Sequence, residues 1–331
     1  MTEQQLLERG RDGDERAYTE LVAPYRRELH AHCYRMLGSV HDADDALQEA
    51  LLRAWRGLAG FEGRSSFRSW LYRITTNACL KLMERRPRLV LPIDYGPATD
   101  PHDGVRAPVT EPVWLGPYPD EQVERRETIE LAFVAALQHL PARQRAVLIL
   151  RDVLGFSGDE VAAQLETTRA SVSSALQRAH KAVDERLPER SQQEALQALG
   201  DGRVRDLVAE YIRAWERGDV DAVVSLLTED AIISMPPIPT WYAGRDAIGR
   251  FLRTRPLNGA RRWRQVPVSA NGQAAVASYL WSDQALGFLA HEITVLDIDG
   301  DRISGIMAFL DSSLVERWGL PGRLPPALGV R

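Results

Sequence analysis

Two stretches of the chain carry cations and small polar side chains of the types that contact nucleic acid. Between 168 and 181 there are three basic residues and no acid, and between 64 and 86 six basic residues and one acid. On a helix, the first stretch would expose groups suited to base edges and phosphates: Arg169, Ser173, Gln177, Arg178 and Lys181. A net charge of −5 argues against DNA binding by an evenly charged chain. Charge segregated in this way instead suits local DNA-binding faces on an acidic protein.

The segment around the first stretch has the pattern of a helix-turn-helix. Ser157 is a favourable N-cap, Glu160 completes a capping box with it, and Thr168 can cap the second helix. The small, turn and apolar positions of the motif fall on Ala162, Glu166 and Val172. The turn position usually holds glycine because its φ is positive, so a glutamate there costs roughly 1 kcal/mol. An ordinary helical hairpin with no role in DNA binding is the alternative.

Four stretches of different composition must position these residues. Residues 1–86 and 128–190 have apolar side chains at helical spacing. Residues 87–127 hold eight of the nineteen prolines, which predicts an extended linker. After a polar bridge, residues 203–318 show two amphipathic helices and then alternating strand patterns. Residues 319–331 form a C-terminal tail.

Several classes of protein do not fit this sequence. It has no apolar run of 18 residues, and its charged N-terminus lacks the apolar region of a secretory signal, so we expect no membrane partner. Cys33 and Cys79 form neither a disulfide framework nor a metal site, and we expect both thiols to be buried in a reducing cytoplasm. We expect no metal and no cofactor.

Two motifs, in the right order, carry a resemblance to a known family. Residues 41–86 (HDADDALQEALLRAWRGLAGFEGRSSFRSWLYRITTNACLKLMERR) resemble region 2 of the sigma-70 superfamily, specifically its extracytoplasmic-function (ECF) group. Residues 130–187, with LPARQRAVLILRDVLGFSGDEVAAQL, resemble region 4. The resemblance covers about 5–190 and implies two all-α domains, region 2 over 1–86 and region 4 over 128–190. It also implies a non-enzymatic factor that binds core RNA polymerase through its β and β′ subunits and recognises promoter DNA.

The resemblance assigns roles to individual positions. An acidic and polar helix face would bind the polymerase: Asp42, Asp44, Asp45, Gln48 and Glu49. The −10 element would be bound by Phe61, Arg64, Ser65, Ser66, Phe67, Trp70, Arg73, Asn77, Lys81 and Arg85. The −35 element would be bound by Thr168, Arg169, Ser171, Ser173, Ser174, Gln177, Arg178 and Lys181. At helical spacing, Trp70 is more often a core residue than a base-stacking one. The side chains expected to hold the acidic helix to its own core are Leu47, Leu51, Leu52 and Trp55.

The linker has a role by analogy with the same group, in which it threads the active-site cleft of the polymerase. Its acids could mimic nucleic-acid charge there: Asp94, Asp100, Asp103 and Glu111. The sequence WLGPYPD at 114–120 resembles a SigG-like branch of the group, whose members carry an added C-terminal domain.

Residues 203–318 resemble SnoaL-like domains, which have the cone-shaped α+β fold of the NTF2-like proteins. We expect a pocket between helices and sheet, lined by Trp215, Met235, Trp241, Tyr242, Tyr279, His291 and Asp311. Strand alternation would place His291 on one face with Ile293, Val295 and Asp297. Because the domain is fused to a sigma factor, we expect it to regulate that factor, with a small ligand or an anti-sigma protein as a further partner.

Two other functions are compatible with parts of the chain. A one-component regulator would sense a ligand with 203–318 and bind a palindrome as a dimer, without polymerase. That function leaves the acidic helix and the basic segment at 61–86 without a role. A bifunctional protein would use a pocket carboxylate or His291 as a general base. Its turnover would survive deletion of residues 1–195.

Overall fold

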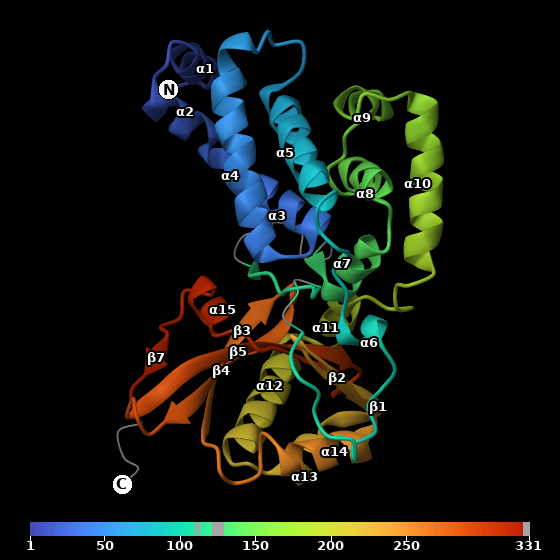
Figure 1. Cartoon of the computed structure of the whole chain (residues 1–331), viewed down its shortest axis with the longest axis vertical. Helices are drawn as coiled ribbons and strands as arrows, with labels where there is room; N and C mark the ends of the chain where they lie inside the picture. The colour runs from blue at the N-terminus through green and yellow to red at the C-terminus, as the bar shows by residue number, and fades with distance from the viewer. Residues whose placement is uncertain (110, 112, 121–128, 327–331) are drawn as a thin grey trace. The chain divides into compact units, whose positions relative to one another are not determined.

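The chain divides into two compact units, and each is described by itself (Figure 1). The computed structural model describes residues 1–109, 111, 113–120 and 129–326. One unit combines 1–89 with 121–187, and the other combines 90–120 with 188–331. The first is helical and the second contains a sheet, which confirms the expected fold classes. The last part of the expected linker, 121–127, and the end of the expected tail, 327–331, lie outside the described residues.

The N-terminal part of the helical unit is built on three packed helices. They are α3 (Arg26–Leu37), α4 (Val40–Gly57) and α5 (Phe67–Met83), preceded by α1 (Glu3–Arg11) and α2 (Glu15–Val22). Gly38 ends α3 with a φ of 74°, and Ser39 then caps α4. Cys33 and Cys79 are buried free thiols in this core. The contacts join α3 to α4, α4 to α5 and α3 to α5, so one apolar core fixes all three helices.

The rest of the helical unit packs against α3 and α5. It contains α7 (Leu131–Gln138), α8 (Ala142–Leu148), the π-helical turn η5 (Ile149–Val153), α9 (Gly158–Gln164) and α10 (Arg169–Asp184). Figure 1 shows α8 and α9 beside α5, with α10 packed on their other side. Contacts join α3 to α7 and α5 to both α8 and α9. The parts expected to be regions 2 and 4 therefore share one folded unit.

The second unit is a curved sheet with helices along it. The strands are β1 (Leu227–Met235), β2 (Ile238–Ala243), β3 (Trp263–Ala270), β4 (Gln273–Ser282), β5 (Gly287–Asp299), β6 (Arg302–Phe309) and the short β7 (Arg323–Leu324). Their order is β2-β1-β6-β5-β4-β3, with β7 on β5. Only the β1–β6 pair is parallel among the described strands.

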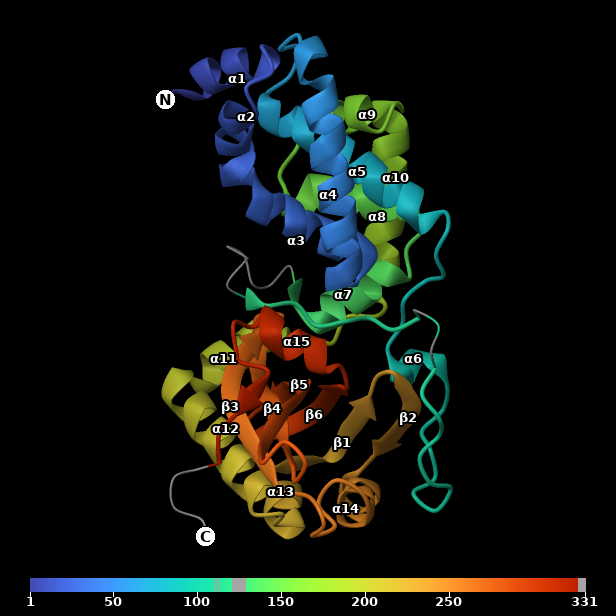
Figure 2. The same ribbon diagram turned by 60° about the vertical axis from the view of Figure 1, so that its left-hand side comes forward.

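Four helices precede or interrupt the strands of this unit along the chain: α12 (Asp201–Glu216), α13 (Val220–Ser225), α14 (Arg245–Thr254) and α15 (Ser312–Arg317). The longest, α12, lies beside β3, as Figure 2 shows. It places Tyr211 and Trp215 in the core, and α14 adds Phe251. Burial of these aromatic side chains against the sheet is the main source of stability for such a layer.

The expected polar bridge is a folded part of the second unit. Ser191 and Glu194 form a capping box that opens α11 (Gln192–Leu199). Gln192 uses both ends of its amide on the β5 backbone, accepting from the Ile298 N–H at 2.8 Å and donating to its carbonyl at 3.2 Å. The polar segment is therefore a helix that packs on the sheet, which its composition alone did not indicate.

The described part of the linker also differs from the extended tract that its prolines predict. Residues 90–120 contain the short α6 (Pro92–Tyr95) and dock on the C-terminal domain. Near β2, the indole N–H of Trp241 donates to Gly96 O at 2.8 Å, and Thr99 N–H donates to Trp241 O at 2.8 Å. Near the end of β3, Tyr118 N–H donates to Asn271 Oδ1 at 2.8 Å. A distant domain supplies these partners, so local composition could not predict them.

Candidate nucleic-acid interface and C-terminal cavity

Helix α5 presents a basic and polar stripe. Ser66 caps the helix by accepting from Ser69 N–H at 3.1 Å. Three exposed side chains then follow on the helix at intervals of four residues, Arg73, Asn77 and Lys81, and Arg85 is exposed in the turn just after its end. Residues four apart lie on one face of a helix, so the first three groups form one continuous surface. Arg64 and Ser65 are exposed in the loop before the helix. This surface can contact a phosphate backbone and base edges.

The three aromatic side chains predicted to bind the −10 element lie elsewhere. Phe61, Phe67 and Trp70 are buried, with ring centroids of Phe61 and Trp70 5.1 Å apart and those of Phe67 and Trp70 5.6 Å apart. Each ring covers apolar surface of its neighbours, so stacking on a base would expose the cluster to water. The prediction of direct DNA contact was wrong for this folded state, and the core role of Trp70 is confirmed.

The acidic face of α4 is exposed at four of its five predicted positions: Asp44, Asp45, Gln48 and Glu49. Asp44 lies 2.9 Å from His30 Nε2, and Glu49 pairs with Arg53 at 2.7 Å. Leu47 and Leu51 are buried, as predicted. Leu52 was expected in the core but is 45% exposed, because it follows Leu51 on the outward side of the helix. Leu52 therefore adds an exposed apolar side chain to the acidic surface.

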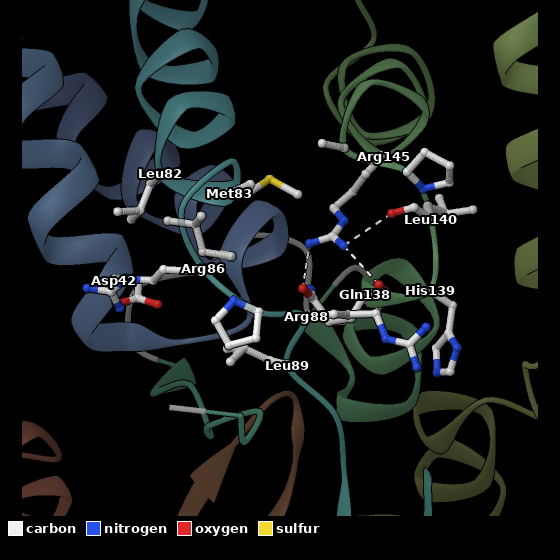
Figure 3. Close-up of a pocket in the computed structure, with 14 residues that line it drawn as sticks. Asp42, Leu82, Met83, Arg86, Arg88, Leu89, Gln138, His139, Leu140 and Arg145 are labelled. Atoms are coloured by element: carbon white, nitrogen blue, oxygen red, sulfur yellow. Dashed lines mark hydrogen bonds and ion pairs between the residues drawn. The ribbon is translucent and has the colours of Figure 1, made fainter. Parts of the chain in front are cut away.

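Asp42 is the fifth predicted position, and it points inward (Figure 3). Its side chain is only 8% exposed and forms an ion pair with Arg86. Burial raises the pKa of Asp42, although the arginine opposes that shift. A carboxylate engaged in this way is not available to the polymerase, so the prediction that it lies on the binding surface was wrong.

A buried cation, Arg145, joins α8 to α3 and α7 (Figure 3). The guanidinium of Arg145 donates to Gln138 Oε1 at 2.5 Å, to Gln138 O at 3.0 Å and to the carbonyl of Met36. Burial lowers its pKa to about 9. Nearer α9, Gln164 Nε2 donates to Ser69 Oγ at 3.0 Å, and both residues are buried. These polar contacts fix the two parts of the helical unit on each other.

The helix-turn-helix forms as the sequence predicts. Ser157 and Glu160 make the capping box of α9, and Thr168 caps α10 by accepting from Ser171 N–H at 3.2 Å. Glu166 has a φ of 50°, which confirms the strained turn. All eight residues predicted to bind the −35 element are exposed: Thr168, Arg169, Ser171, Ser173, Ser174, Gln177, Arg178 and Lys181. Val172 and Ala179 are buried, so the opposite face of α10 holds the helix in place.

The C-terminal unit encloses a cavity of about 190 Å³. Three of the seven predicted pocket residues line it: Trp215, Met235 and His291. The other four do not. Trp241 bonds to the linker, the Tyr242 ring stacks on Phe251 at 5.0 Å, Tyr279 OH donates to Pro321 O, and Asp311 caps α15.

Sequence reasoning missed Glu292 and Thr294, which line the cavity together with His291. In β5, Ala290 pairs with Tyr279 and Glu292 with Ser278, so His291 is the extra residue of a β-bulge. The bulge changes the alternation of the strand. Ile293 and Val295 therefore do not share a face with His291, and that prediction was wrong.

Comparisons with known proteins follow the same division. Family models match Sigma-70 region 2 over 21–88, Sigma-70 region 4 over 130–183 and a SnoaL-like domain over 208–306. The ECF RNA polymerase sigma factor SigG of Mycobacterium tuberculosis is 46% identical over 326 residues, 95% of this chain and 86% of that protein. The chain belongs to the ECF family of RNA polymerase sigma factors. Its partners are therefore core RNA polymerase and promoter DNA.

Two further relatives define how far the likeness extends. The ECF RNA polymerase sigma-E factor of Escherichia coli (strain K12) is 31% identical over 194 residues, 56% of this sigma factor and 95% of that protein. The crystal structure of the M. tuberculosis sigma factor SigJ matches with a TM-score of 0.57 and 24% identity, over 90% of this chain and 97% of that one. That match shows a shared fold.

Family membership decides between the alternative functions. Sigma factors are non-enzymatic transcription initiation factors, so the chain is neither a stand-alone DNA-binding regulator nor an enzyme in its N-terminal regions. Among the described residues, no helix has the length and apolar character of a membrane span.

Proposed function

We propose that this sigma factor uses three exposed surfaces of its helical unit and that its SnoaL-like domain restrains the linker. Asp44, Asp45, Gln48 and Glu49 on α4 bind core polymerase, whose complementary surface is basic. The stripe of Arg73, Asn77 and Lys81 on α5, with Arg85 just after the helix, binds the −10 element, and the exposed face of α10 binds the −35 element. The factor works in the cytoplasm, where polymerase and promoters are.

The observation that carries the first part is the separation of charge on the unit. The acids lie on α4, while α5 and α10 present cations on their exposed faces. A surface that binds a basic protein and two surfaces that bind phosphates need opposite charges, and here they occupy different helices.

Reversing one charge on α4 tests the polymerase-binding surface. Asp45 is exposed, so Asp45→Lys changes the surface without disturbing the core. We expect core-polymerase binding to weaken at least tenfold, about 1.4 kcal/mol, because a cation then faces a basic partner. Reconstituted transcription on a library of promoter fragments should fall in parallel. Asp206→Lys, an equally exposed change on α12, is the control. Equal losses in both variants would contradict the assignment.

The second part rests on the hydrogen bonds between linker and domain. In addition to the bonds of Trp241 and Asn271, Arg106 N–H donates to Thr240 Oγ1 at 3.0 Å and Val109 N–H donates to Pro237 O at 2.9 Å. A linker held in this way cannot also thread the cleft of the polymerase. The domain therefore limits the activity of the factor.

A double variant releases the linker. Trp241→Phe removes the bond to Gly96, and Asn271→Gly removes the bond to Tyr118 while keeping the φ of 57° free of strain. We expect transcription with core polymerase to rise several-fold, since each lost bond removes about 1 kcal/mol of restraint. Trp318→Phe with Asn258→Gly is the control, because these side chains bond to Ser269 and Ala260. The restraint would be refuted if the linker amides of the double variant exchanged faster with solvent while its transcription stayed unchanged.

A further inference from the structure

The SnoaL-like domain contains a cavity to which promoter recognition assigns no role. Its volume of about 190 Å³ is a little larger than the apolar cavity of roughly 150 Å³ that binds benzene. Most of its wall is apolar and comes from the sheet, from α14 and from the residue after β6: Ile233, Met235, Ile238, Phe251, Ile306 and Leu310. A molecule with one ring and a short substituent fits this space.

One wall of the cavity carries a hydrogen-bond donor without a partner. Trp215 is 4% exposed, and its indole N–H has no partner among the described residues. The indole of Trp263, which also lines the cavity, donates to Pro256 O at 2.8 Å. An indole nitrogen can only donate, and a buried donor without an acceptor is costly. An acceptor on a bound molecule would remove that cost.

The charges around the cavity favour an anion. Arg255 and Arg261 line it and are exposed, so they stand where the cavity meets solvent. Glu292 is the one acid among the described lining residues, and burial raises its pKa, which favours its neutral form. His291 Nε2 lies 3.9 Å from Glu292 Oε2, and this imidazole is the remaining titratable group of the wall. A neutral carboxyl group can donate a hydrogen bond, as the indole does.

We propose that this cavity binds a small carboxylic acid with an apolar body, such as a single ring on a short chain. The ring would contact the apolar wall, and the carboxylate would pair with Arg261 and accept from the Trp215 N–H. Val105 of the docked linker also lines the cavity and packs against the domain core. A bound acid therefore contacts the linker directly and holds it in place, a step that rests on the proposed restraint.

Calorimetric titration of the full chain tests the class of ligand. The probes are phenylacetate and phenylacetamide, which share size and shape but differ in charge. We expect phenylacetate to bind at one site per chain and phenylacetamide to bind at least tenfold more weakly. Equal affinity for the two probes would overturn the proposal. So would the absence of saturable phenylacetate binding up to about 20 mM, which is weaker than about 0.3 kcal/mol for each of its ten non-hydrogen atoms.

Two variants place the site in the cavity. Arg261→Gln should weaken phenylacetate binding about tenfold, while Arg262→Gln should leave it unchanged, because the guanidinium of Arg262 lies 4.1 Å from the ring of Trp281. Trp215→Phe keeps the ring and removes the donor, and should weaken binding three- to tenfold. If Trp215→Phe does not fold, the comparison of Arg261→Gln with Arg262→Gln still tests where phenylacetate binds. Equal effects of Arg261→Gln and Arg262→Gln would overturn the assignment.

Hydrogen exchange measures the effect on the linker separately. The amides of Thr99, Arg106 and Val109 bond to the strand β2 region and report docking. Addition of saturating phenylacetate should slow the exchange of these amides in the wild type. The same concentration should leave their exchange rates unchanged in Arg261→Gln. If phenylacetate binds and these amides exchange at the same rate, the ligand site stands and its coupling to the linker is refuted.

Discussion

At the scale of residues, single buried charges mark where this protein departs from its sequence pattern. Asp42 faces Arg86 instead of the polymerase, and Glu292 enters the cavity because a bulge at His291 shifts the strand. Capping pairs such as Ser157 and Glu160 were predictable because both partners lie within one turn. The partner of Asp42 lies 44 residues away, and no local pattern encodes it.

Glu292 makes the stability of the C-terminal unit depend on pH. Its folded pKa is raised by burial, so the stability it contributes is present below its unfolded pKa and is lost as pH rises through its folded pKa. Glu292→Gln removes this loss. We expect the melting temperature of the variant to exceed that of the wild type at pH 8, by about 2–4 °C for each kcal/mol, and to match it at pH 4.

Calorimetry at the two pH values checks this expectation, with Glu229→Gln as the control. Glu229 is an exposed glutamate of the same domain, so its replacement should leave the pH dependence unchanged. A Glu292→Gln variant whose advantage is the same at pH 4 and pH 8 would mean that ionisation of this carboxyl does not affect folding.

At the scale of elements, the positions of the helices could be predicted from the sequence. Which side of each helix is buried could be predicted only in part. Apolar spacing and caps are local, so α9 and α10 form where the sequence places them. The aromatic residues of the segment from Phe61 to Trp70 could have faced DNA or the core, and composition alone does not distinguish the two. Packing of three rings against one another decides for the core.

The exposed stripe of α5 should carry the electrostatic part of −10 binding. Replacing Arg73 and Lys81 with alanine removes two cations from one face, and neither side chain is buried. We expect promoter opening by the reconstituted holoenzyme to fall, and the salt dependence of binding to lose a slope of about 0.7 per cation, the value for single strands. Arg56→Ala, at the exposed end of α4, is the control. A slope that is unchanged in the double variant would exclude contact with the strand.

At the scale of the whole molecule, the two halves of the helical unit are too close for promoter binding. Elements at −10 and −35 lie about 25 base pairs apart, roughly 85 Å along B-DNA. Helix α10 is only about 24 Å long, at 1.5 Å for each of its 16 residues, and it contacts α9, which contacts α5. With the proposed −10 and −35 surfaces, binding of both elements would require the junction of Ser69, Gln164 and Arg145 to open.

Gln164→Ala tests this requirement. The change removes the buried bond to Ser69 and should shift the equilibrium toward the open form by about 1 kcal/mol. If core polymerase also binds only the open form, its affinity should rise up to about fivefold while the melting temperature of the helical unit falls. Gln4→Ala on the exposed face of α1 is the control. A less stable variant with unchanged affinity would show that core polymerase binds the closed form.

The linker also has a consequence for solubility. In the order of the sheet, β2 and β3 are the outer strands, and the docked linker lies against both, through Thr99 and Val109 beside β2 and through Pro119, which bridges Ala270 of β3. An uncovered outer strand presents unpaired backbone groups that can pair with another molecule. Under the proposed restraint, the domain would expose these edges each time the linker left to enter the polymerase. Activation by this route would carry a risk of self-association, which re-docking of the linker would end.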